Sequence, residues 1–216
     1  SDAETLPRLS RFIEAEGHGR YRFQHALICE AAYAGLPVRR RRVLHGRAAD
    51  HFEAVAADLD EQSELLSLHY FEASRMDDAW KYSRAAARRA LEKYSYPEAV
   101  QFLSRAVTAG RAIAADDIDA LVQVHESLGD AELHVGELER ARTSYRHARR
   151  LVGDRPLLTS ELLRKEAVVE QRIGRVSMAL RTLTRAMSLI VADESRTAAA
   201  ERARLLLMAR KLYRFA

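Results

Sequence analysis

The residue types that could do chemistry are few in this sequence and widely separated. The 216-residue chain has eight histidines and one cysteine. No two histidines are four residues apart, the spacing that places two imidazoles on one helix face for zinc, and one cysteine cannot support a zinc finger. The chain also lacks the Gly-x-Ser-x-Gly and Gly-x4-Gly-Lys-[Ser/Thr] motifs. We therefore expect no catalytic residue, no metal site and no cofactor, and hence no enzyme in this chain.

The cysteine, Cys29, ends the apolar run Ala26–Cys29. We expect a buried, unreactive thiol there, and a lone cysteine fits a reducing compartment. No apolar run approaches the roughly 20 residues that span a bilayer, and we recognise no signal peptide. These observations predict a cytoplasmic protein without a membrane segment.

The densest run of charge is Arg39–Arg42, which could contact nucleic-acid phosphates or an acidic surface. Four consecutive residues point to all sides of a helix, however, and no aromatic residues alternate with them. The net charge of +4 is too small an excess to indicate nucleic-acid binding by itself. A solvated helix face is the favoured interpretation. The alternative is a nucleic-acid-binding module that uses Arg39, Arg40, Arg41 and Arg42.

The elements that would position these residues are mostly helices. The low counts of 9 Gly and 4 Pro favour helices over a turn-rich β fold. Residues 125–148 predict two helices joined by a tight turn at Gly136. In the second helix Ala141, Tyr145 and Ala148 share one stripe. The small residues on this stripe allow two helices to approach closely, and the ring fills the space between them.

The same small–large–small spacing recurs on both sides of this segment. It is found at Ala99, Leu103 and Ala106 and again at Ala179, Leu183 and Ala186. With Leu128-Gly129 in the preceding helix, the pattern resembles the tetratricopeptide repeat, a helical hairpin of 34 residues. The resemblance implies an all-α fold, a right-handed stack of about four antiparallel helical hairpins that bury one another's apolar faces.

Apolar periodicity also sets the expected order of elements. It predicts helices over 63–74, 77–93, 118–135, 138–152, 156–173 and 176–191, with further helices starting near 95 and 195. Before these we expect a short helix over 6–16, a strand over 21–23, a helix over 24–33 and a second helix that contains Arg39–Arg42. We also expect both ends to be cut from a longer protein, because the last helix lacks the partner of a final hairpin.

The N-terminal segment carries a second resemblance. The residues that carry it are Tyr21, Phe23, His25, Ala26, Leu27, Ile28, Ala32, Tyr33, Leu36, Pro37, Arg39–Arg42, Leu44 and His45. Their order and spacing are similar to a junction in large bacterial signalling ATPases of the STAND type, where a winged-helix segment leads into helical repeats. The resemblance implies that residues 1–55 are the C-terminal part of a winged-helix-like segment with its connecting helix. Residues 56–216 would then be tetratricopeptide-like repeats, truncated at the C-terminus.

Proteins of this kind are multidomain regulators with an adenylate cyclase domain or a LuxR-type DNA-binding domain as output. The resemblance therefore implies a non-catalytic protein-interaction or sensor segment of a bacterial signal-transduction regulator. ATPase or cyclase activity would belong to other domains of the full-length protein. The implied partner is a protein or peptide, or a neighbouring domain of the same chain.

Tetratricopeptide proteins usually hold peptides with the outward residues of the first helix of each hairpin, on the concave face. Transferred by the phase of the motif, the implied residues are Lys81, Arg84 and Arg88, then Gln123, Glu126, Asp130 and His134, and finally Arg164, Gln171 and Arg172. This groove would be basic, acidic and basic in turn, and could hold an extended segment of complementary charge. The alternative is an ordinary charged surface with no binding role.

Overall fold

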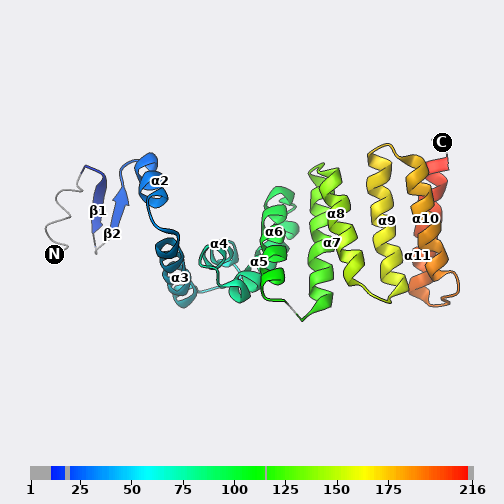
Figure 1. Cartoon of the computed structure of the whole chain (residues 1–216), viewed down its shortest axis with the longest axis horizontal. Coiled ribbons are helices and arrows are strands. Elements are labelled where there is room, and N and C mark those ends of the chain that lie inside the picture. The colour runs from blue at the N-terminus through cyan, green and yellow to red at the C-terminus, as the bar shows by residue number, and fades with distance from the viewer. Residues whose placement is uncertain (1–10, 18–19, 115, 214–216) are drawn as a thin grey trace.

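The computed structural model describes residues 11–17, 20–114 and 116–213. In these residues a two-stranded sheet precedes ten helices (Figure 1). The elements are β1 (Ile13–Gly17), β2 (Arg20–Phe23), α2 (Ala26–Ala34), α3 (Val38–Val55), α4 (Ser63–Glu72), α5 (Met76–Glu92), α6 (Tyr96–Ala112), α7 (Ile118–His134), α8 (Leu138–Leu151), α9 (Pro156–Arg172), α10 (Val176–Ile190) and α11 (Arg196–Tyr213). The predicted all-α stack of helical hairpins is confirmed.

From α3 onward each helix packs against the next, and the two ends of the chain lie at opposite ends of the stack (Figure 1). Alternate helices also form two rows. We call α5, α7, α9 and α11 the groove row, because side chains join these helices: Lys165 of α9 binds Asp130 of α7 at 2.6 Å, and Arg164 of α9 binds Glu201 of α11 at 2.6 Å. We call α6, α8 and α10 the outer row.

The stripe of small and large residues packs as its spacing predicts. Ala141, Tyr145 and Ala148 of α8 are fully buried. A Cβ atom at Gly129 of α7 would lie 2.6 Å from Cε1 of the Tyr145 ring, so only glycine allows the ring this position. The Tyr145 hydroxyl donates a hydrogen bond of 2.7 Å to Oδ1 of Asp130. The Leu128-Gly129 signal therefore marks the place where the ring of α8 crosses α7.

Four helix-to-helix turns share one backbone geometry. Gly136 and Gly174 take φ values of 84° and 88° in the turns α7–α8 and α9–α10, while Ser74 and Tyr94 take 60° and 57° in the turns α4–α5 and α5–α6. In each turn the next N–H donates to the carbonyl five residues earlier, over 2.8–3.0 Å. The two glycines were visible turn signals, whereas the other two turns use residues that seldom adopt positive φ.

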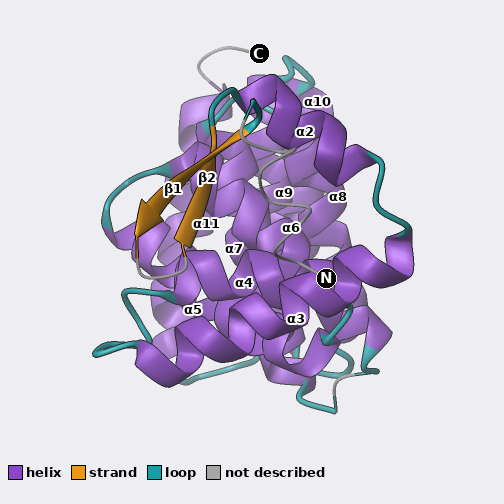
Figure 2. Ribbon diagram, turned by 90° about the vertical axis from the view of Figure 1, so that its left-hand side faces the viewer, coloured by secondary structure: helices purple, strands orange, loops and turns teal. Residues whose placement is uncertain are grey.

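The N-terminal segment departs from the expected helix over 6–16. Residues 13–16 of that range lie in β1, which pairs antiparallel with β2, and residues 6–10 lie outside the described residues. In β1 the apolar Ile13 and Ala15 alternate with Glu14 and Glu16, as in a hairpin strand. The helix was expected instead because Leu9, Phe12 and Ile13 fall on one helix face. Figure 2, which faces this end, shows both strands in front of the helices. The strand expected over 21–23 lies within β2.

The expectation of a buried thiol is wrong. Cys29 is exposed, and α2 has no buried residue at all. An apolar run predicts burial only where another element covers it, and no described element covers this face of α2.

At the other end, Leu206, Leu207 and Tyr213 of α11 are also exposed. None of the described helices is both long and apolar enough to cross a bilayer.

Candidate peptide-binding groove

An open hollow of about 550 Å³ lies between α5 and α7 in the groove row. Apolar side chains, among them Leu91 and Leu103, form part of its lining. Four of the residues predicted for the groove also line it: Lys81, Arg84, Arg88 and Gln123. Three basic residues of α5 and one residue of α7 that the repeat phase predicted for the groove therefore lie around the same hollow.

Arg84 is the cation of this hollow that has no ionic partner among the described residues. Its guanidinium lies over the indole of Trp80, 4.9 Å from the ring centroid, a contact that holds the cation without neutralising it. Trp80 is itself fixed by α6, where a Cβ at Gly110 would lie 2.8 Å from the indole. The stack of Arg84 on Trp80 thus presents a positive charge beside an apolar surface.

The other two cations that line the hollow are partly neutralised. Arg88 forms ion pairs with Asp60, from the connection before α4, and with Glu92 at 3.9 Å. Lys81 donates a hydrogen bond of 3.1 Å to the Tyr82 hydroxyl, and this bond raises the pKa of the Lys81 ammonium. Lys81 also lies 3.9 Å from a carboxylate oxygen of Glu53 in α3, so both cations share their charge with residues from the N-terminal part of the stack.

The expected acidic part of the groove is neutralised from within. Glu126 and Asp130 of α7 both bind the ammonium of Lys165 in α9, at 2.7 and 2.6 Å. Sequence reasoning missed Lys165. A signal was available, since α7 carries four carboxylates and no Lys or Arg, and Lys165 is a cation on the next helix of the same row. These carboxylates join α7 to α9 and are not free for a partner.

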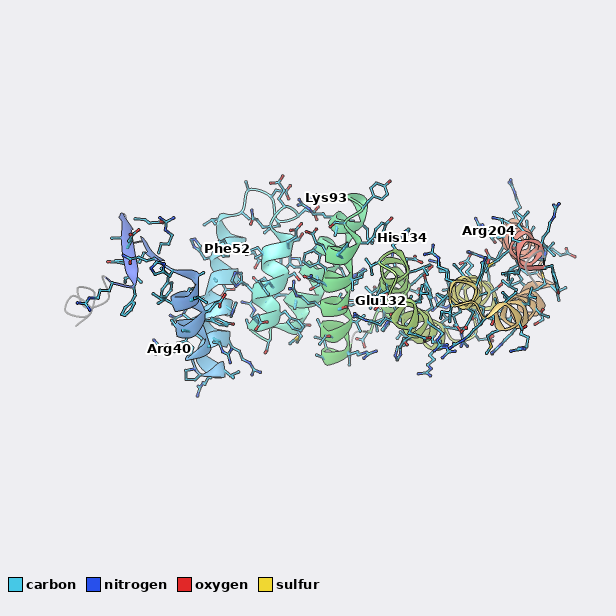
Figure 3. All side chains as sticks on the ribbon, turned by 90° about the horizontal axis from the view of Figure 1, so that it is seen from above. Arg40, Phe52, Lys93, Glu132, His134 and Arg204 are labelled. Atoms are coloured by element: carbon cyan, nitrogen blue, oxygen red, sulfur yellow. The ribbon has the colours of Figure 1, made fainter. Side chains whose placement is uncertain are left out.

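His134 and the third expected set do not line the hollow. His134 lies at the surface, where its ring stacks on Tyr96 at 4.0 Å between centroids, whereas Glu132, also labelled in Figure 3, is buried. Arg164 binds the buried carboxylate of Glu201. Gln171 is exposed, and Arg172 donates to the Leu133 carbonyl at 3.4 Å. The hollow itself therefore brings together only the first expected set and Gln123.

The run at Arg39–Arg42 occupies the first turn of α3. Arg39, Arg40 and Arg42 are exposed, and Arg41 is half-buried with its guanidinium 5.3 Å from the centroid of the Tyr33 ring. Among the described residues, no group of three or more His, Cys, Asp or Glu side chains could hold a metal ion. At Arg39–Arg42 the structure thus shows exposed charges and one contact with a ring.

No protein-family model matches the chain, and no curated protein matches it. Solved structures of helical-repeat proteins are similar. The TPR domain of Arabidopsis OM64 matches with 16% identity and a TM-score of 0.45, covering 62% of this chain and 98% of that one. The MamA protein matches with 14% identity, a TM-score of 0.42, and coverage of 81% and 88%. A thermophilic TPR protein of Thermus thermophilus has 19% identity, a TM-score of 0.32, and coverage of 84% and 94%. At these scores the similarities carry no weight for function.

Proposed function

We propose that this chain is a non-catalytic protein-interaction segment, and that the hollow between α5 and α7 binds a peptide of a partner protein. The observation that carries the proposal is Arg84, stacked on Trp80 beside an apolar lining with no described carboxylate bound to it. Such a site fits an apolar side chain followed by a carboxylate. The side chain would enter the hollow, and the carboxylate would meet the guanidinium.

The wider setting is also a proposal. The N-terminal junction resembles that of bacterial STAND-type signalling ATPases, with residues 1–55 as a winged-helix-like segment and 56–216 as repeats. On this basis the chain is the cytoplasmic sensor segment of a signal-transduction regulator, in which an ATPase controls an adenylate cyclase or transcription. The bound peptide would come from another protein or from a neighbouring domain. It would favour one of two states by binding one more tightly than the other.

A chain of contacts links the hollow to the N-terminal segment. Lys81 lines the hollow and donates to the Tyr82 hydroxyl, which in turn donates to the carboxylate of Glu53 in α3. Tyr70 of α4 donates to the same carboxylate, and these two hydroxyls lower the pKa of Glu53. A carboxylate that draws Lys81 toward the hollow would weaken this link. Binding could thereby alter how α3 packs on the repeats.

A peptide array tests the function. The wild-type chain is expected to select sequences that combine a bulky apolar residue with a nearby Asp, Glu or C-terminal carboxylate. Arg84→Glu should lose these spots, because it replaces attraction by repulsion. The matched control is Arg40→Glu, which reverses the charge of an exposed arginine on α3 (Figure 3). If both variants bind the same peptides as the wild type, the hollow is not the binding site.

A further inference from the structure

The two rows of helices differ sharply in charge. The outer row, α6, α8 and α10, carries nine arginines and two carboxylates, and α10 has no acidic residue. In the groove row, α7 has four carboxylates and no Lys or Arg. The four helices of the groove row together carry twelve Lys or Arg and eleven carboxylates, so the excess of positive charge among these helices lies mainly on the outer row. Such an excess produces a positive potential over one face.

Part of this positive charge holds the rows together. Arg149 of α8 binds the buried carboxylate of Glu166 in α9 at 2.7 Å, and Arg142 binds that of Glu170 at 3.3 Å. These two arginines stabilise the contact between α8 and α9, and their charge is already paired, so they are not candidates for binding a partner. Arg105 of α6 lies over the Phe102 ring and is not exposed. Four exposed arginines of the outer row form no ion pair with a carboxylate of the described residues. They are Arg111 of α6, Arg150 of α8, and Arg181 and Arg185 of α10.

All four of these arginines are exposed. Arg150, Arg181 and Arg185 lie on the sides of α8 and α10 away from the buried positions, whereas Arg111 lies at the edge of the buried face of α6. Burial, and then the charges of Arg111 and Arg150, lower the pKa of the half-buried His147 ring.

The ring of His147 stacks on that of His125 in α7, with 5.4 Å between centroids. His125 is buried, and its Nδ1 atom has no hydrogen-bond partner among the described residues. Burial and the neighbouring cations lower the pKa of His125 to about 4.

On α10 the two arginines lie between apolar side chains. Met178, Arg181, Arg185 and Leu189 follow one stripe of the helix at spacings of three and four residues, and all four are exposed. An anionic partner on this stripe would also cover apolar surface at both ends. This combination fits a protein segment in which Asp or Glu residues are accompanied by aliphatic side chains.

We propose that the outer row binds an acidic protein segment through Arg111, Arg150, Arg181 and Arg185, on the side of the stack away from the hollow. Two observations favour a protein over a nucleic acid. No aromatic side chain is exposed on α8 or α10, so bases have no stacking partner there. The apolar ends of the α10 stripe would gain nothing from phosphates, whereas an acidic segment with aliphatic residues covers them.

Fluorescence anisotropy with the 216-residue chain tests this proposal. The probe is a labelled synthetic peptide of Glu and Leu, with Leu along one face when the peptide is helical. A peptide with Gln in place of Glu and a labelled DNA duplex are titrated in parallel. One variant carries Arg→Gln at positions 111, 150, 181 and 185. The matched control carries Arg→Gln at positions 39, 40, 42 and 47, which are also exposed arginines without a described ion pair and lose the same charge.

The Glu-Leu peptide should bind the wild type and weaken with added salt, and the Gln-Leu peptide should not bind. The outer-row variant should bind the acidic peptide about tenfold more weakly or worse, because four exposed charge contacts are lost. The control variant should bind within about twofold of wild type. Equal losses in both variants would show attraction to net charge alone and overturn the proposal. Preferential binding of the duplex, or no binding of the acidic peptide, would also overturn it.

Discussion

Gly129→Ala should destabilise the chain, although alanine is the better helix residue. The added Cβ would lie 2.6, 2.7 and 3.0 Å from three atoms of the Tyr145 ring. That ring is fully buried, and its hydroxyl is held by Asp130 at 2.7 Å. Overpacking of a core costs about 1–3 kcal/mol, and we take the upper end because the ring is fixed at both ends. Helix propensity returns about 1 kcal/mol, which leaves a net loss of about 2 kcal/mol.

Urea unfolding followed by circular dichroism measures this loss as a shift of the midpoint. Gly46→Ala is the matched control, since Gly46 is also helical but its Cβ would meet only Ala73, at 3.8 Å. It should stabilise the chain by about 0.5–1 kcal/mol. Tyr145→Leu should remove most of the additional penalty of Gly129→Ala in a double variant. If Gly129→Ala unfolds at the same urea concentration as wild type, the close contact of α7 and α8 described above is wrong.

Three further predictions concern charge. Arg164→Met should lower the free energy of unfolding by about 3 kcal/mol, because the buried Glu201 carboxylate loses its closest cation. The control Arg84→Met should change the free energy of unfolding by less than about 0.5 kcal/mol. Equal urea midpoints for the two variants would contradict this prediction. For His125, a folded pKa of about 4 against 6.5 means that stability is complete above pH 6.5 and falls by about 3 kcal/mol as the pH drops toward 4. His125→Phe should remove that part of the decline between about pH 7 and pH 4, and an unchanged pH profile would exclude it. Labelled duplex DNA should not bind at about 50 or 200 mM salt; binding that is lost at the higher salt, and in the Ala variant of Arg39–Arg42, would favour the nucleic-acid alternative.

The hairpin stack was predictable because its signals are local. Small and large residues three and four positions apart must share a helix stripe. Tyr145 lies between two alanines on such a stripe, and its ring packs against Gly129 of the preceding helix. The failure in the N-terminal segment has the opposite cause. Burial of Cys29 depends on whether another element covers α2, which an apolar run cannot reveal by itself.

The groove was predictable only in part, because a helix phase predicts direction but not pairing. Four of the residues that the helix phase predicted for the groove, Lys81, Arg84, Arg88 and Gln123, lie together around the hollow. Whether a charge there is free depends on residues 28 to 37 positions away, as with Asp60 for Arg88 and Glu201 for Arg164. Such partners follow from how helices cross, and no motif in the sequence encodes them.

The difference between paired and unpaired cations decides which charged residues of a helical repeat can be tested for binding. Arg149 and Arg150 are adjacent in the sequence, yet one neutralises the buried Glu166 and the other has no described carboxylate partner. Reversing the first would place a second carboxylate beside the buried Glu166 and leave it only the longer ion pair with Arg146, so a loss of binding could reflect loss of stability. Reversing the second removes only an outward charge. Sites in this stack are therefore best sought among cations that pair with no carboxylate of the described residues, such as Arg84 at the hollow and the four arginines of the outer row.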